Sequence, residues 1–340
     1  MPAEFFHVAC ARDALSTLPA LPFEIDSASF ALGCQGPDIF SHNRRTKPLS
    51  LAYARLLHRR EYGTFSGHLA VLLSRSDVRA QSWFLGFLTH ASVDRTVHPY
   101  VISKSCPIPG ESGPDIDRAR LHAFFERILD DALEGYRGTD GEGVAWQCAP
   151  VRIPEGLPEA LARPVAEALS RTYRDKAGDR VAERVLNAFA DSGRVFALTA
   201  PDRGRSFISD DLARLIGYGP DAVALLRPVG LRERADWLNL GREAWPEPVS
   251  GELRRDSVPE LASLAAQRSA AALIAGISVL TGEREPSALA ALIGNQCLSA
   301  CGEGGLPAPA RYSAPFDLSR FLLQQTELRQ AQVLRGTDFG

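Results

Sequence analysis

Two short stretches of the sequence carry histidines and carboxylates at helical spacing, and they constrain the fold more than any other feature. The first is HASVDRTVH, with His90, Asp94 and His98 at its start, middle and end, and the second runs from His122 to Glu126. Residues three or four apart lie on one face of an α-helix. Each stretch therefore predicts a helix with one row of imidazole and carboxylate groups, which are ligands of transition metals.

The length of the first row indicates more than one metal ion. His90 and His98 are separated by about 12 Å of helix rise, too far for one ion with ligand bonds of about 2 Å. Asp94 lies between them, where one carboxylate can bridge two ions. His98 is then free to join His122 and Glu126 around a second ion. Two histidines and one carboxylate with an open position form a catalytic zinc shell.

The composition excludes several classes of protein. Hydrophobic residues make up 45% of the chain and charged residues 23%, close to the averages for soluble globular proteins. No apolar run approaches the roughly 20 residues of a membrane span, so we expect no transmembrane segment. The net charge of -3 argues against a general nucleic-acid binder and leaves nucleic acid only as a substrate. Because the N-terminus has no secretory pattern, we expect a cytoplasmic protein.

The six cysteines lack a CxxC pair or a zinc-finger spacing, so we expect buried thiols. Cys297 and Cys301 are one helical turn apart, which is compatible with a metal pair, but a buried helix face is the favoured interpretation. The cysteines are Cys10, Cys34, Cys106, Cys148, Cys297 and Cys301.

Apolar residues recur at spacings of three and four and seldom alternate, which predicts an all-α fold. We expect one multi-helical domain, with a metal-binding core at about 5–200 and a decorated C-terminal helical part at about 201–340. Pro99 is expected to end the third helix and to leave His98 beside a loop. The predicted helices are Leu49–His58, His68–Leu73, Trp83–His98, Arg118–Leu133, Leu157–Arg174, Asp179–Phe189, Ser209–Ile216 and Pro259–Leu280.

Upstream of both rows, LGCQGPDIF forms a turn that presents the carboxylate of Asp38. This segment, ARLLHRREYGTF around His58, and FLGFLTHASVDRTVHPYV together resemble the bacterial zinc-dependent phospholipase C family. That family has an all-helical fold and a trinuclear zinc site, both shared with fungal single-strand nucleases. The resemblance runs from His7 to Glu126 through ligand motifs and resumes weakly at DWLNL, residues 236–240.

The resemblance also implies ligand groups. Asp38, His58, His90 and Asp94 would surround one zinc, and His98, His122 and Glu126 another. Asp94 would bridge to a third zinc, which His7 would help to complete. In the secreted enzymes a terminal tryptophan completes that third site, whereas this chain begins Met1-Pro2-Ala3. We therefore expect two zinc ions and leave the third open. The gap between His98 and His122 is longer than in the family, which predicts an inserted loop beside the second zinc.

The activity implied by the resemblance is hydrolysis of a phosphodiester or phosphomonoester by a metal-activated water. Asp38 is expected to ligate a zinc and also to orient or deprotonate that water. The expected partner is a small phosphate-ester substrate, either a phospholipid or a soluble ester. The alternative is a non-catalytic metal-binding helical protein with a degenerate site. A nucleotide phosphohydrolase with an adjacent His-Asp pair fits less well, because the chain has no such dipeptide.

Several histidines also allow a plain structural interpretation. A histidine on an apolar helix is often a hydrogen-bonded core residue, and this applies to His90 and His98. His68 competes with His58 for the upstream ligand position, and His58 is favoured because Gly63 and Phe65 follow it as in the family.

His42 lies in a polar loop that is expected to be surface. The neighbouring Arg44, Arg45 and Lys47 are candidates for attracting a phosphate.

Overall fold

The computed structural model describes residues 4–107, 117–138, 151–199 and 223–335, which are predominantly helical. The strands among these residues, β1 (Trp245–Pro246) and β2 (Leu253–Arg254), form one short antiparallel pair. The all-α prediction is therefore confirmed. The helices are α1 (Glu4–Ser16), α2 (Ser27–Gly33), α3 (Asp38–Ser41), α4 (Leu51–Arg59), α5 (Tyr62–Leu73), α6 (Val78–Ser105), α7 (Arg118–Gly138), α8 (Leu157–Tyr173), η1 (Arg174–Ala177), α9 (Val181–Thr199), α11 (Val258–Leu280), α12 (Pro286–Ile293), η3 (Glu303–Gly305) and α13 (Leu318–Arg335).

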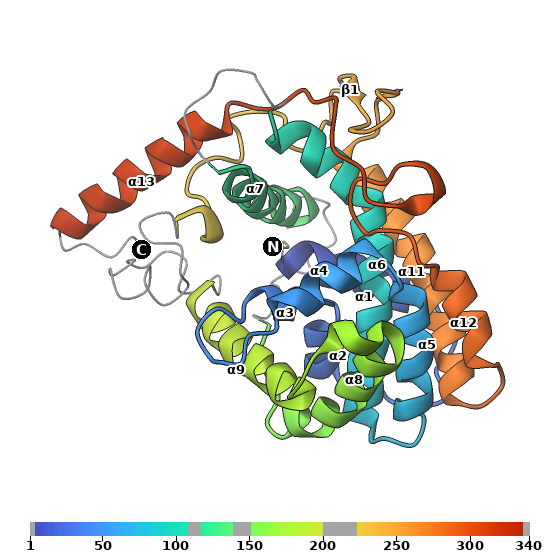
Figure 1. Ribbon diagram of the computed structural model, residues 1–340. Helices are drawn as coiled ribbons and strands as arrows, with labels where there is room; N and C mark the ends of the chain where they lie inside the picture. The colour runs from blue at the N-terminus through green and yellow to red at the C-terminus, as the bar shows by residue number, and fades with distance from the viewer. Residues whose placement is uncertain (1–3, 108–116, 139–150, 200–222, 336–340) are drawn as a thin grey trace.

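Helix α6 is the central element of the fold. Asp77 caps its N-terminus by accepting a hydrogen bond from the backbone N–H of Ala80. It packs closely against α2 and α11 and also contacts α1 and α7. Figure 1 shows α6 beside α11, with α7 above α1, α3 and α4. Helices from distant parts of the sequence thus surround the residues of α6.

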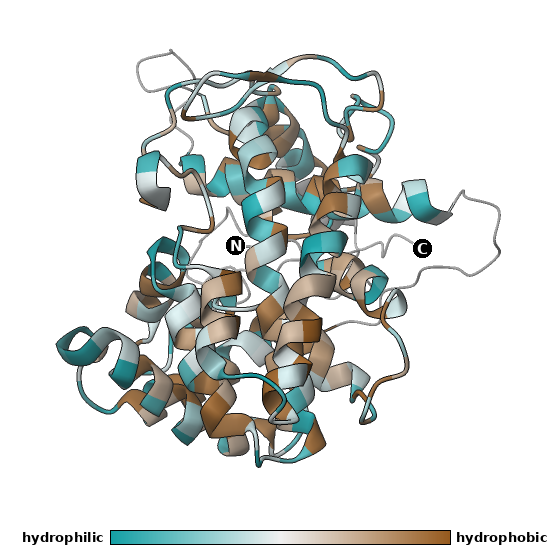
Figure 2. Cartoon of the chain, turned by 90° about the vertical axis from the view of Figure 1, so that its right-hand side faces the viewer, coloured by the Kyte–Doolittle hydropathy of each residue, from teal (hydrophilic) through white to brown (hydrophobic). Residues whose placement is uncertain are grey.

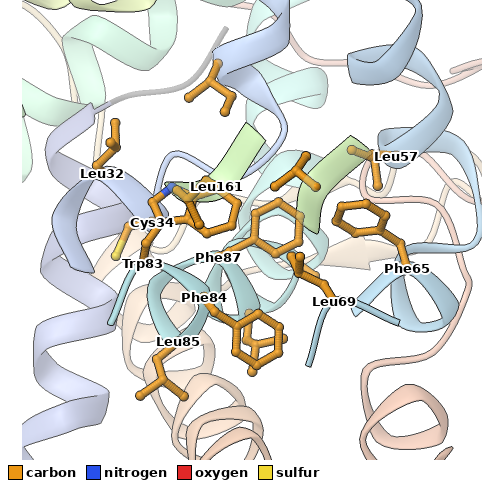
Figure 3. Packing of buried hydrophobic residues seen from close by; sticks show 14 of the residues in the cluster. Leu32, Cys34, Leu57, Phe65, Leu69, Trp83, Phe84, Leu85, Phe87 and Leu161 are labelled. Atoms are coloured by element: carbon orange, nitrogen blue, oxygen red, sulfur yellow. The ribbon is translucent and has the colours of Figure 1, made fainter. Parts of the chain in front are cut away.

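Two hydrophobic clusters flank the middle of α6. Trp83, Phe84 and Phe87 belong to the first cluster and pack among residues such as Phe65 and Leu161 (Figure 3). The second cluster surrounds the other end of α6 and includes Tyr100. Most helices carry alternating hydrophobic and hydrophilic bands (Figure 2), as expected for helices with one face on a core. His90, Asp94 and His98 lie on α6 where these two clusters meet.

Helix α6 does not end at Pro99, so this prediction was wrong. The helix continues to Ser105. Proline removes one backbone hydrogen bond, but tertiary packing can hold a helix through it. Here Tyr100 is fully buried in the second cluster, and its hydroxyl donates to the backbone oxygen of Trp237 at 2.9 Å. His98 therefore lies within the helix rather than at its end.

The predicted bounds of α4, α8 and α11 agree with the structure within two residues. Helix α5 begins six residues before its predicted start, α9 ends ten residues after its predicted end, and α6 and α7 are also longer than predicted. Helices α1, α2, α3, α12 and α13 were missed. In α1 the residues from Glu4 to Ala11 are all buried, so the sequence carries no contrast between a polar and an apolar face. The predicted helix Ser209–Ile216 falls outside the described residues.

Helix α11 is long and apolar enough to cross a membrane by length and composition. However, half of its most apolar stretch is buried inside the protein, where α11 packs against α6 and α1. This is the usual environment of a core helix. The absence of a transmembrane segment stays a prediction.

Cys297 and Cys301 form a disulfide outside any helix, so the prediction of thiols on a buried helix face was wrong for this pair. Of the other cysteines, Cys10 and Cys34 are free and buried, and Cys106 is free and partly buried. Cys148 lies outside the described residues. Because disulfides persist mainly in oxidising compartments, this one gives no support to the cytoplasmic prediction, which stays untested.

Candidate metal centre

Eight predicted site residues converge from five helices onto one cluster of imidazole and carboxylate groups. They are His7 on α1, Asp38 on α3, His58 on α4, His90, Asp94 and His98 on α6, and His122 and Glu126 on α7.

Asp94 lies at the middle of the cluster and is 1% exposed. Its Oδ1 is 3.3 Å from Nε2 of His7 and 3.4 Å from Nε2 of His98. Its Oδ2 is 3.1 Å from Nε2 of His90 and 3.6 Å from Nε2 of His58. Each oxygen of one carboxylate therefore faces two imidazoles, an arrangement that suits a bridging ligand.

Asp38 is the first residue of α3, and its carboxylate also faces two histidines. Its Oδ1 is 3.2 Å from Nε2 of His58, and its Oδ2 is 3.5 Å from Nε2 of His90. The preceding turn needs Gly36, which has a φ of +54°. A Cβ at Gly36 would lie 2.3 Å from Cγ of His90, so glycine allows the turn to approach that imidazole.

A second group forms where α6 meets α7. Oε1 of Glu126 is 3.0 Å from Nε2 of His122, one helical turn earlier, and 3.3 Å from Nε2 of His98. His98 also faces Asp94, so it lies between the two groups. The side chains of His58, His98 and His122 are 13–21% exposed, whereas those of His90 and Asp94 are at most 1% exposed. Solvent therefore reaches the cluster at His58, His98 and His122.

The separations fit a tetrahedral metal. Two ligand atoms about 2.1 Å from a tetrahedral zinc are about 3.4 Å apart, and the nitrogen–oxygen distances in the cluster are 3.0–3.6 Å. Three sets of ligand atoms lie within 4.8 Å of one another: His58 with His90 and Asp94, His98 with His122 and Glu126, and His7 with Asp38 and His90.

Backbone carbonyls orient three of the imidazoles. Nδ1 of His58 donates to the oxygen of Ala54 at 2.7 Å. Nδ1 of His90 donates to Cys34 and Nδ1 of His98 donates to Leu298, both at 3.1 Å. Because a carbonyl oxygen can only accept, Nδ1 carries a proton in each ring, and the neutral form of the ring, which binds metal, presents the lone pair of Nε2 to the cluster. A hydrogen bond from the ring nitrogen that faces away from the metal is typical of metal-binding histidines.

The cluster has a strong preference for added positive charge. Burial alone would lower the pKa of His58, but the Asp38 and Asp94 carboxylates outweigh it and raise that pKa to about 9. Burial would raise the pKa of Asp38, but His58 and His90 lower it to about 2. Nε2 of His90 and both carboxylate oxygens of Asp94 are buried without a hydrogen-bond partner among the described residues. A cation between these atoms would satisfy them, so the residues fit a zinc centre.

Sequence reasoning missed a segment from the far end of the chain that supports two of the histidines. The carbonyl of Leu298 accepts from His98, and its backbone N–H donates to the oxygen of His58 at 2.8 Å. Arg95 fixes this segment because its guanidinium donates to the carbonyls of Ile293, Gly294, Gln296 and Cys297. No signal in the sequence pairs these residues, which lie about 200 positions apart.

A pocket of about 320 Å³ opens beside His58. Arg55 and Arg59 from α4 line it, together with Ser299 and Ala300 from the C-terminal part of the chain. The sequence analysis did not select these arginines, although Arg55 precedes His58 by three residues and Arg59 by four, which places Arg55 beside both on the helix surface.

The remaining candidates lie outside the cluster. Nδ1 of His68 is 3.1 Å from the Thr172 hydroxyl, so His68 is an ordinary helix residue. His42 is buried rather than on the surface, 3.2 Å from the Ser192 hydroxyl, because its loop packs on α9. Arg44, Arg45 and Lys47 do not line the pocket beside His58.

His7 offers a test of the cluster's outer edge. It stacks on His90 with ring centroids 4.4 Å apart and contacts only one oxygen of Asp94. We expect His7→Ala to lower zinc content by about one equivalent. Activity should fall less than it does when Asp94 is altered.

Helix α1 should stay folded in His7→Ala, because Asp130 accepts the backbone N–H groups of Phe5 and Phe6. Elemental analysis and amide exchange of α1 test both points. Unchanged zinc content would identify His7 as a packed histidine.

Comparison with known protein families gives one match. The family model described as zinc dependent phospholipase C matches residues 6–190, more than half of the chain. The matched span contains all eight residues of the cluster. No curated protein matches the chain, and no solved structure does.

Proposed function

Because the chain belongs to the zinc-dependent phospholipase C family, we propose that it is a zinc-dependent phosphoesterase that hydrolyses a phosphodiester or phosphomonoester. The observation that carries this proposal is the position of Asp94, whose two oxygens each face two imidazoles at 3.1–3.6 Å. A bridging carboxylate among oriented histidines is the arrangement that a multinuclear hydrolytic centre requires.

We assign the ligands in three groups. Asp38, His58, His90 and Asp94 would hold one zinc. His98, His122 and Glu126 would hold a second, and His7 with Asp94 would contribute to a third. When bound, the ions would polarise the phosphoryl oxygens and lower the pKa of the attacking water.

The chain's own residues would orient the reaction. The Asp38 carboxylate faces His58, which is the ligand nearest to the pocket, so Asp38 can accept a hydrogen bond from the attacking water and orient it. The fixed proton on Nδ1 keeps the His58 imidazole in a single orientation.

Hydrolysis by zinc-loaded protein tests the proposal. Suitable substrates are p-nitrophenyl phosphorylcholine, bis-p-nitrophenyl phosphate and short single-stranded nucleic acids. We expect at least one to be cleaved about 100-fold faster than by chelator-treated protein. His68→Ala is a matched control, because this histidine lies outside the cluster.

Protein that binds zinc fully and cleaves none of these substrates would favour the alternative, a metal-binding protein with a degenerate site. Metal content alone does not separate the two functions.

A further inference from the structure

We infer that the pocket beside His58 binds a second anionic group of the substrate, separate from the phosphoester that is cleaved. This inference rests on the proposed function and adds the class of substrate: a phosphoester that also carries a carboxylate or a further phosphate.

The pocket adjoins the candidate metal centre at His58. This residue lines the pocket, and Nε2 of its ring is 3.2 Å from Oδ1 of Asp38. On α4, Arg55 precedes His58 by three residues and Arg59 by four, so Arg55 lies beside both of them on the helix surface. A molecule whose phosphate binds at His58 can therefore place a neighbouring group beside the two guanidinium groups.

The charged side chains that line the pocket are positive. Arg55 and Arg59 are exposed, and neither forms an ion pair with any residue in the described part of the chain. Among the residues that the structure describes, no carboxylate lines the pocket. Two uncompensated guanidinium groups in a concave site attract an anion, which each can bind through two parallel hydrogen bonds, and disfavour a cationic substituent such as an ammonium group.

The part of the pocket wall that comes from the C-terminal segment has small side chains and is held in place. Ser299, Ala300 and Ala308 have short side chains, which leave room at the wall for a polar group. The disulfide between Cys297 and Cys301 and the four carbonyl contacts of Arg95 hold this wall in place. A volume of about 320 Å³ suits a head group rather than a lipid tail.

Binding of three phosphonates that differ in one terminal group tests the inference without depending on catalysis. They are 3-phosphonopropionate, propylphosphonate and 2-aminoethylphosphonate, which end in a carboxylate, a methyl group and an ammonium group. Titration calorimetry with zinc-loaded protein should give the highest affinity for the compound that ends in a carboxylate, a lower affinity for the one that ends in a methyl group, and the lowest for the one that ends in an ammonium group. We expect the first to bind about tenfold more tightly than the second. Ethylene diphosphonate, as a fourth probe, distinguishes a preference for a terminal phosphate from one for a carboxylate.

In the double variant Arg55→Gln with Arg59→Gln, the preference for 3-phosphonopropionate over propylphosphonate should fall below about twofold. The affinity for propylphosphonate itself should stay within about threefold of that of the unaltered protein. Arg60→Gln is the matched control, because Arg60 is exposed and adjacent but does not line the pocket. The control should keep the preference.

A preference that survives in the double variant would assign the carboxylate to the zinc centre and overturn the inference. Equal binding of all three phosphonates to the unaltered protein would overturn it as well. Protein that shows the preference but cleaves no substrate would instead contradict the proposed function alone.

Discussion

Replacing Asp94 with Asn is expected to lower phosphoester hydrolysis by about three orders of magnitude. The carboxylate is buried, and its oxygens face four imidazoles. An amide has nearly the same shape but no charge, and it presents N–H groups to lone pairs of Nε2. It can neither bridge two cations nor offset their repulsion. Zinc content should fall together with kcat/KM.

The fold of this variant should persist, because Asn keeps the volume of Asp inside α6. Circular dichroism and the thermal midpoint of chelated protein check this, with His68→Ala as the histidine control outside the cluster. Full zinc content combined with near-normal activity in Asp94→Asn would contradict the bridging role.

Removing the metal should have the second large effect. Purified protein is expected to carry at least two equivalents of zinc, since His90 and His98 are too far apart to share one ion. When the free zinc concentration is about a thousandfold above the Kd of a site, binding at that site stabilises the fold by about 4 kcal/mol. Chelation should therefore lower the thermal midpoint by on the order of 10 °C. Elemental analysis showing one equivalent or none in metal-replete buffer would contradict a multinuclear centre.

The chelated protein should also respond to pH in a defined direction. The pKa of His58 and of His122 is raised to about 9 in the folded chain, because neighbouring carboxylates outweigh the effect of burial. A raised pKa stabilises the fold below the unfolded value of about 6.5, and that contribution is lost as pH rises through 9. Thermal midpoints of chelated protein should fall over this range. Zinc-loaded protein should show a smaller decrease, since the ions replace the protons.

Local spacing made much of the cluster predictable. The rows on α6 and α7 follow directly from helical periodicity, which places His90 beside Asp94 and His122 beside Glu126. The choice of His58 over His68 depended on Gly63 and Phe65. Gly63 lies against α12, where a Cβ would be 2.3 Å from the oxygen of Ala290. Gly63 therefore allows α5, which starts just after His58, to pack closely against α12.

Long-range packing set the limits of prediction. The rule that proline ends a helix failed at Pro99 because burial of Tyr100 holds the helix on its far side. The Cys297–Cys301 disulfide and the contacts of Leu298 depend on a segment folding back across the molecule. Helix α1 left no periodic pattern because it is buried almost all round. The single-domain organisation with its boundary near residue 200 stays a prediction.

The backbone contacts of Leu298 imply that this part of the chain tolerates substitution of its side chains but not a change in its length. A main-chain carbonyl holds His98 and a main-chain amide reaches the oxygen of His58, so another apolar residue at position 298 would leave both contacts in place. Inserting or deleting one residue between 293 and 301 would shift both. Relatives that share the metal centre should therefore vary in side chains here but conserve the length of the segment, although it lies outside the span that the family model matches.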